Sequence, residues 1–129
     1  EGGVTGRQPR VLVIAGSDSG GGAGIQADLK TVTMLGGYAA TAVTAVTVQD
    51  TLGVSAIHPV PPEIVARQIR AVLDDIGADA IKIGMLGDAA TAEAVADALR
   101  RVSVPIVLDP VMVAKGGSAL LAEDAIGAL

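Results

Sequence analysis

Residues 11–24 read VLVIAGSDSGGGAG, an apolar run that passes directly into a glycine-rich segment. A short continuous apolar run is typical of a strand that is buried on both faces of a parallel sheet. The glycines predict a loop over residues 16–22, and the residues after them predict a helix over 23–35 that ends at Gly36 and Gly37. A buried strand, a glycine-rich loop and a helix in this order indicate an α/β fold.

The following residues repeat the alternation of strand and helix. Apolar and β-branched runs predict strands over 41–48, 54–58, 80–83 and 105–108. Pro61 and Pro62 predict the start of one helix, and Asp88 is placed to cap another. We expect that second helix to bury one face, formed by Ala92, Val95, Ala96 and Leu99. The expected architecture is a largely parallel sheet with helices packed on it.

The two ends of the chain are expected to differ from this pattern. Residues 1–10 are rich in glycine and predict a flexible leader, which leaves 11–129 as one domain. Residues 122–129 resemble the first turns of a helix with no strand after it. We therefore expect the sheet to be incomplete at the C-terminus.

Composition excludes several classes of protein. The chain has 129 residues, a formal net charge of −5 and no cluster of Lys or Arg, whereas a nucleic-acid-binding surface is usually basic. No apolar run reaches the roughly 18 residues of a membrane-spanning helix. The lack of Cys excludes disulfides and thiolate zinc sites. We expect a cytoplasmic protein that binds neither nucleic acid nor membranes.

The glycine-rich loop is the first candidate binding site. It follows the carboxyl end of a buried strand, where ligands of open α/β sheets bind. Glycines let a backbone approach a ligand closely, and free N–H groups at a helix start attract anions. Residues 22–27 also match the loose dinucleotide pattern, with Asp50 placed where an acid could bind a ribose. The alternative is a tight turn that binds nothing.

Four side chains are expected at the same edge of the sheet, and each has two interpretations. Asp28 either interacts with the helix dipole or accepts a hydrogen bond from a substrate hydroxyl. Gln49 either pairs with the edge of a heterocycle or is an ordinary loop residue. Met85 either lines a ligand pocket or packs in the core. Lys82 either forms a structural ion pair or binds phosphate.

Two further residues complete the candidates. Asp109 ends a strand and either caps a turn or holds Mg²⁺ through water beside phosphates. His58 is the only histidine, and no nucleophile pattern lies near it, so we interpret it as structural. No Walker A signature is present, which disfavours a P-loop kinase.

Four segments, taken in order, resemble a known family. Residues 13–31, 44–51, 81–86 and 107–117 are similar to the motifs of hydroxymethylpyrimidine/phosphomethylpyrimidine kinases, which are members of the ribokinase-like superfamily. The resemblance extends over 11–129. It implies a three-layer αβα fold and transfer of the ATP γ-phosphoryl group, with Mg²⁺, to hydroxymethylpyrimidine and then to its monophosphate in thiamine biosynthesis. It also implies a homodimer.

The resemblance assigns roles to individual residues. Asp28 would lie near the hydroxymethyl group, and Gln49 would bind the ring nitrogen and the amino group of the pyrimidine. Asp109 would face Mg²⁺ or the ATP phosphates. The substrate-binding set that it implies is Gly16, Asp28, Gln49, Met85 and Val111. No catalytic residue can be assigned, because the family carries its anion hole and its catalytic Cys or Asp in a later half.

The expected function therefore has alternatives. Since that later half is not in these 129 residues, we expect no catalysis by this chain alone, and a non-catalytic binding module is one alternative. Pyridoxal kinases of the same superfamily share the glycine-rich motif, and some close relatives have Met where this chain has Gln49. Gln at that position favours an aminopyrimidine, because a lost hydrogen-bonding edge can cost ~1–3 kcal/mol.

Overall fold

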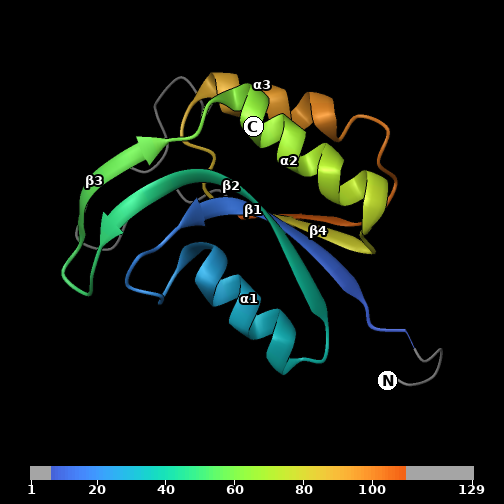
Figure 1. The fold of residues 1–129 in the computed structure, drawn as a ribbon, viewed down its shortest axis with the longest axis horizontal. Helices are drawn as coiled ribbons and strands as arrows, with labels where there is room; N and C mark the ends of the chain where they lie inside the picture. The colour runs from blue at the N-terminus through green and yellow to red at the C-terminus, as the bar shows by residue number, and fades with distance from the viewer. Residues whose placement is uncertain (1–6, 110–129) are drawn as a thin grey trace.

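A computed structural model of the chain describes residues 7–109. Within these residues, strands and helices alternate along most of the chain (Figure 1). The elements are β1 (Arg10–Ser17), α1 (Gly24–Met34), β2 (Tyr38–Gln49), β3 (Val54–Pro59), α2 (Pro62–Asp75), β4 (Ala80–Ile83), α3 (Ala89–Ala98) and β5 (Ile106–Leu108).

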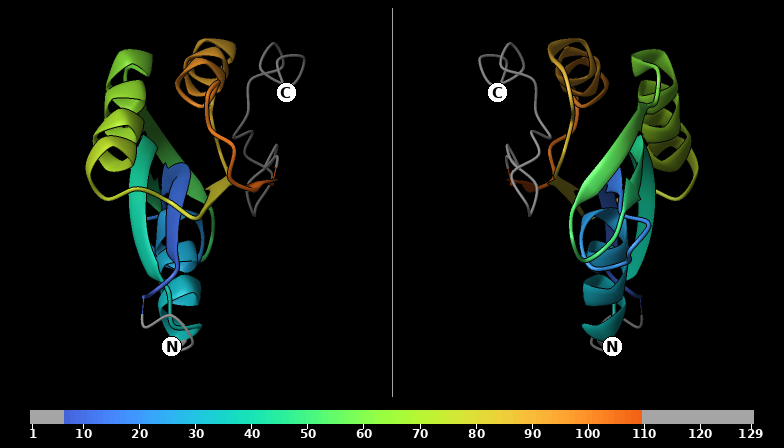
Figure 2. Two further views of the ribbon diagram at one scale, coloured as in Figure 1. Left: turned by 90° about the vertical axis from the view of Figure 1, so that its right-hand side faces the viewer. Right: turned by 90° about the vertical axis from the view of Figure 1, so that its left-hand side faces the viewer.

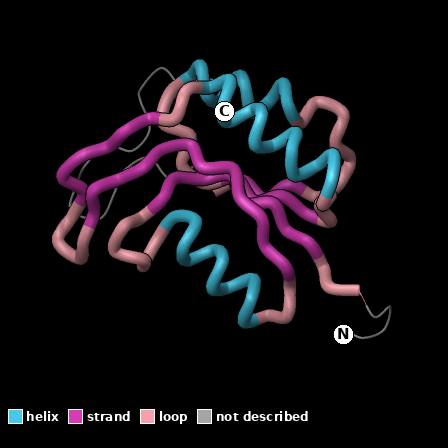
Figure 3. Tube along the Cα trace, viewed as in Figure 1, coloured by secondary structure: helices cyan, strands magenta, loops and turns pink. Residues whose placement is uncertain are grey.

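The strands form one sheet in the order β3-β2-β1-β4-β5. β1 pairs in parallel with β2 and β4, and β4 pairs in parallel with β5. β3 is antiparallel to β2, because the two strands are joined by a short turn and not by a helical crossover (Figure 3). The sheet is therefore largely parallel, as the sequence predicts.

The helices divide between the two faces of the sheet. α1 covers one face, and α2 and α3 lie side by side on the other (Figures 1 and 2). Along β1, Leu12 and Ile14 face α2 and α3, whereas Val13 and Ala15 face α1. This alternation follows from the two-residue period of a strand, and it explains why β1 is apolar throughout. The three-layer α/β arrangement is thus confirmed.

Local signals predict most element boundaries well. β4 has the predicted bounds, and Asp88 caps α3, since its Oδ1 accepts a hydrogen bond of 2.8 Å from the Thr91 amide. One predicted face is wrong in part: Ala96 is exposed, while Ala92, Val95 and Leu99 are buried. α3 buries only a narrow stripe against α2 and the sheet, and Ala96 lies outside it.

The predicted leader also needs a correction at its end. Arg10 is the first residue of β1, and its carbonyl accepts a hydrogen bond of 2.8 Å from the Asp79 amide. Its side chain forms an ion pair with the Asp79 carboxylate at 3.0 Å. These bonds join the amino ends of β1 and β4, so β1 starts one residue earlier than the apolar pattern indicates. Residues 1–6 lie outside the described part.

All helices in the described part are short. The longest, α2, has 14 residues, whereas a membrane-spanning helix needs about 20. Over residues 7–109, therefore, no helix is long and apolar enough to cross a membrane.

Candidate functional site

A cavity of about 250 Å³ opens at the carboxyl ends of β1, β2 and β4, beside the start of α1. The chain leaves β1 toward β2 and β3 on one side, whereas β4 and β5 lie on the other. The sheet order thus reverses between β1 and β4, and such a switch point is where open α/β sheets bind ligands. The lining residues that concern the site are Gly16, Asp18, Asp28, Thr47, Gln49, Lys82, Met85 and Asp109.

Asp18 fixes the conformation of the glycine-rich loop, and it is not among the residues predicted from the sequence to form the site. The Asp18 side chain accepts hydrogen bonds from the amides of Gly20 at 2.7 Å, Gly22 at 3.0 Å and Ala23 at 2.8 Å. Asp18 is only 5% exposed. These three loop amides are therefore not free to bind an anion, because a carboxylate of the chain already occupies them; the first amides of α1 itself are not among them.

Other contacts make the loop a rigid wall of the cavity. The Gln26 side chain accepts a hydrogen bond from the Asp18 amide at 2.8 Å and donates one to Ser17 Oγ at 2.8 Å. Gly24 has a φ of +58°, and a Cβ there would collide with the Gly16 carbonyl oxygen. Glycine is needed at Gly24 for both reasons. The loop thus contributes to the site through its shape.

Gly16 and Met85, both predicted to contact substrate, lie against each other at the cavity. A Cβ on Gly16 would collide with the Met85 methyl group. Met85 is 8% exposed, and its carbonyl accepts a hydrogen bond of 2.6 Å from Thr44 Oγ1. Met85 therefore belongs to the core and to the cavity wall at once, which reconciles the two interpretations of this residue.

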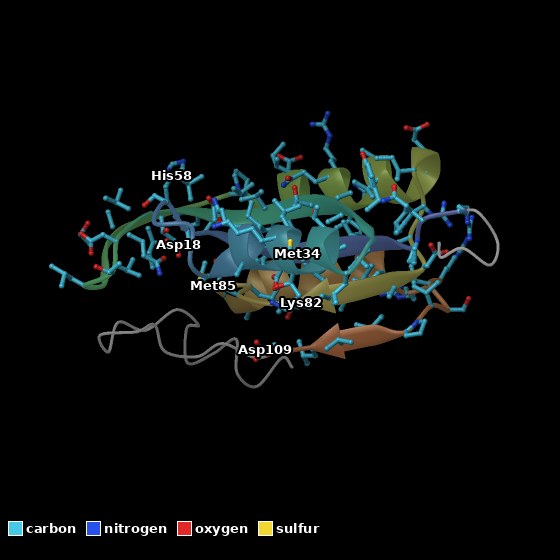
Figure 4. All side chains as sticks on the ribbon, turned by 90° about the horizontal axis from the view of Figure 1, so that it is seen from below. Asp18, Met34, His58, Lys82, Met85 and Asp109 are labelled. Atoms are coloured by element: carbon cyan, nitrogen blue, oxygen red, sulfur yellow. The ribbon has the colours of Figure 1, made fainter. Side chains whose placement is uncertain are left out.

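Asp28 and Lys82 form an ion pair at the cavity, with Lys82 Nζ at 2.8 Å from Asp28 Oδ2. Figure 4 shows Lys82 beneath α1, with Met85 nearby. The structural ion pair that was one interpretation of Lys82 is confirmed. Asp28 lies beyond the first turn of α1, so the predicted interaction with the helix dipole is wrong. Both side chains keep about a quarter of their surface exposed, at 22% for Asp28 and 25% for Lys82.

Gln49 ends β2 and lies on the cavity wall. Its neighbour is Thr47, whose Oγ1 is 2.6 Å from the Ser17 carbonyl oxygen and 3.1 Å from Gln49 Oε1. Thr47 is not among the site residues predicted from the sequence. The signal was present, because residues two apart on a strand point to the same side of the sheet.

Asp109 follows β5 and also lines the cavity (Figure 4). Its amide donates a hydrogen bond of 2.9 Å to the Ile83 carbonyl, which fixes its position beside the end of β4. Over residues 7–109, no group of three or more His, Cys, Asp or Glu side chains is placed to hold a metal ion. Asp109 thus brings a single carboxylate. Val111, the last predicted site residue, lies outside the described residues.

The structure does not favour the dinucleotide alternative. Asp50, the proposed ribose-binding acid, accepts hydrogen bonds from the amides of Leu52 at 2.8 Å and Gly53 at 3.2 Å. It stabilises the turn between β2 and β3 and is not among the residues that line the cavity. His58 is exposed on β3 and lies far from Asp109 across the molecule (Figure 4).

Proteins that are similar to this chain in sequence and in fold include kinases of small molecules. The profile of a family described as Phosphomethylpyrimidine kinase matches residues 18–129. A hydroxymethylpyrimidine/phosphomethylpyrimidine kinase of Mycobacterium tuberculosis is 57% identical over 123 residues, which cover 94% of this chain and 45% of that protein. The chain thus spans about half the length of the curated relatives that it matches.

Solved structures agree with this result. The phosphomethylpyrimidine kinase of Clostridium difficile is similar with a TM-score of 0.87 at 42% identity, over 95% of this chain and 53% of that one. The pyridoxal kinase of Staphylococcus aureus in complex with AMP-PCP and pyridoxal is similar with a TM-score of 0.75 at 40% identity, over 84% of this chain and 40% of that one.

Proposed function

Since the chain belongs to the phosphomethylpyrimidine kinase family, we propose that its cavity binds the pyrimidine alcohol that such a kinase phosphorylates. The proposed reaction is transfer of the γ-phosphoryl group of ATP to hydroxymethylpyrimidine, and then to its monophosphate, in thiamine biosynthesis. Phosphoryl transfer depends mainly on positioning and on electrostatic stabilisation of the transferred group. The described residues would contribute the positioning of the acceptor alcohol.

The observation that carries the proposal is the set of groups around one cavity. An amide from Gln49, a carboxylate from Asp28 and the thioether of Met85 come from β2, α1 and the end of β4. A flat heterocycle with a polar edge and a hydroxymethyl group needs these three kinds of contact. The amide would pair with the polar edge, the thioether would contact the ring, and the carboxylate would accept a hydrogen bond from the hydroxyl.

Lys82 supports the role of Asp28. Its ammonium group binds Asp28 Oδ2 at 2.8 Å, and within the described residues Oδ1 has no hydrogen-bond partner. A hydroxyl that donates to Oδ1 would have its oxygen oriented by a carboxylate that the ion pair already holds in place. Orientation of this kind lowers the entropic cost of reaching the reactive geometry.

The proposal includes ATP and Mg²⁺ because the chain belongs to a family of kinases. An Asp carboxylate is the hard oxygen ligand that Mg²⁺ takes, and Mg²⁺ usually keeps water and phosphate oxygens as its other ligands. Asp109 at the cavity wall fits one such position, while the described residues supply no complete metal site. The homodimer is likewise a proposal.

Calorimetric titration of hydroxymethylpyrimidine into the chain, without ATP, tests the proposal. We expect saturable binding that Gln49→Ala weakens about tenfold or more, since the ligand edge and the cavity then lose paired hydrogen bonds. Gln8→Ala is the matched control, because Gln8 binds the Gly36 carbonyl near the amino end of β1, away from the cavity. Equal binding by the wild type and the Gln49 variant would contradict the assignment.

Pyridoxal is the second candidate substrate, and the similarity to the Staphylococcus aureus enzyme supports it. Pyridoxal has no exocyclic amine beside its ring nitrogen, so Gln49 would lose one of its two contacts. We therefore expect pyridoxal to bind more weakly than hydroxymethylpyrimidine in the same titration. A reversed order of affinities would favour pyridoxal as the substrate.

A further inference from the structure

The Thr47 hydroxyl has one proton and two close oxygen neighbours. Its Oγ1 is 2.6 Å from the Ser17 carbonyl oxygen and 3.1 Å from Gln49 Oε1. A carbonyl oxygen can only accept, so the short contact with Ser17 requires the Thr47 proton. Toward Gln49, Thr47 Oγ1 then presents only a lone pair.

A lone pair on Thr47 needs a donor as its partner. The two ends of a Gln amide have the same shape, so the hydrogen-bond network decides which end lies where. We propose that Gln49 carries Nε2 against Thr47 and Oε1 away from it, and that Thr47 is the positioning residue that sets this order. With the opposite order, two acceptor oxygens would face each other without a proton between them.

Burial fixes the direction of the Thr47 proton. Thr47 lines the cavity but is only 5% exposed, so water has little access to its hydroxyl. The register between β1 and β2 shifts between Ala15 and Ser17. At this irregularity the side-chain hydroxyl of Thr47 donates a hydrogen bond to the Ser17 carbonyl. The bond to Ser17 is therefore part of the sheet, and the orientation of Gln49 follows from it.

The order of donor and acceptor has a consequence for the ligand. Nε2 keeps a second proton, so the edge of Gln49 that remains for a ligand presents one donor, on the side of Thr47, and one acceptor beyond it. A matching ligand places an acceptor next to Thr47 and a donor beside that acceptor. The ring nitrogen and amino group of an aminopyrimidine have this pattern; this step rests on the proposed function.

Thermal unfolding without ligand tests the orientation. Gln49→Glu places an acceptor oxygen at the contact with Thr47, so we expect a lower melting temperature in the Thr47 background and a smaller change in the Thr47→Val background. Thr47→Ser keeps the hydroxyl and should behave as Thr47 does. An equal effect of Gln49→Glu in the Thr47 and Thr47→Val backgrounds would overturn the proposed orientation.

Ligand discrimination tests the consequence. The probes are hydroxymethylpyrimidine and the analogue in which the amino group is replaced by hydrogen. We expect the wild type to prefer the amino compound by about tenfold, and Thr47→Val to lose most of that preference while Thr47→Ser retains it. If Thr47 had only a structural role, Thr47→Val would weaken the binding of both ligands equally. That outcome would overturn the positioning role.

The two tests separate this inference from the proposed function. If the wild type binds neither compound, the proposed function fails, while the unfolding experiment still decides the orientation of Gln49. If the wild type binds the amino compound and Thr47→Val keeps the preference, the proposed function stands and Thr47 does not position Gln49.

Discussion

The two faces of the sheet differ in what they contain. Under α2 and α3, large aliphatic side chains such as Leu12, Ile69 and Ile81 are fully buried and form one continuous core. Under α1 the buried set is much smaller, consisting of Val13, Ala15 and Ile25. β1 supplies residues to both sets, because its alternate residues point to opposite faces.

The difference indicates that the face under α2 and α3 contributes mainly to stability and the face under α1 mainly to binding. Hydrophobic stabilisation scales with the apolar area removed from water, so the face under α2 and α3 contributes most of it. On the α1 face, Lys82 takes the strand position where an apolar residue would continue the core, and the cavity opens beside it. Variants on the two faces should therefore have different effects.

The largest effect is expected in the core under α2 and α3. Ile69 is 0% exposed, so Ile69→Ala should lower the free energy of unfolding by about 2–5 kcal/mol, through lost burial and the cavity left behind. Ile25→Ala, in the smaller core under α1, should cost less. Urea denaturation measures both. A cost for Ile25→Ala equal to that of Ile69→Ala would contradict the contrast between the faces.

The next effect concerns two glycines at the cavity. Gly24→Ala forces a residue with a side chain into a positive φ and against the Gly16 carbonyl, so we expect a cost of about 1–3 kcal/mol. Gly16→Ala meets only the flexible methyl end of Met85, so it should cost less stability. It should still weaken hydroxymethylpyrimidine binding, because the displaced methyl group enters the cavity. Denaturation and calorimetry together separate the two variants.

A smaller change in stability is expected at the ion pair of the α1 face. Lys82 and Asp28 are partly exposed, so a double-mutant cycle with Lys82→Met and Asp28→Asn should give a coupling of about 1 kcal/mol or less. Affinity for hydroxymethylpyrimidine should nevertheless fall in Lys82→Met. Arg100→Met is the control, since it breaks the exposed Arg100–Asp97 pair at the end of α3. Unchanged affinity in Lys82→Met would contradict the proposal that Lys82 orients Asp28 for the substrate hydroxyl.

The smallest effect is expected at the amino ends of the strands, away from the cavity. Hydrogen bonds from the Arg10 side chain and amide lower the pKa of Asp79 from 3.8 to about 2. This contribution to stability is complete above pH 3.8 and is lost as the pH falls through about 2. The difference in unfolding free energy between wild type and Asp79→Asn should therefore be constant near neutral pH and shrink in acid. A difference that does not change between pH 7 and 2 would contradict this.

Local patterns predicted much of the fold. The apolar run of β1 and the bounds of β4 follow from residue type alone, because a doubly buried strand must be apolar. The Asp88 cap is also local, since its partner Thr91 is three residues away. Gly16, Asp28, Gln49, Met85 and Asp109 all line the cavity, and their roles toward substrate, phosphate or metal stay predictions.

Sequence by itself determined which segments become strands and helices, because periodicity, caps and turns act over a few residues. Only the tertiary structure decided the order of the strands in the sheet and the bond between Asp28 and Lys82. Asp28 and Lys82 lie 54 positions apart along the chain, and no local pattern relates them. The hydrogen bond from the Thr47 hydroxyl to the Ser17 carbonyl was also decided by the tertiary structure, because the pairing of two strands brings these groups together.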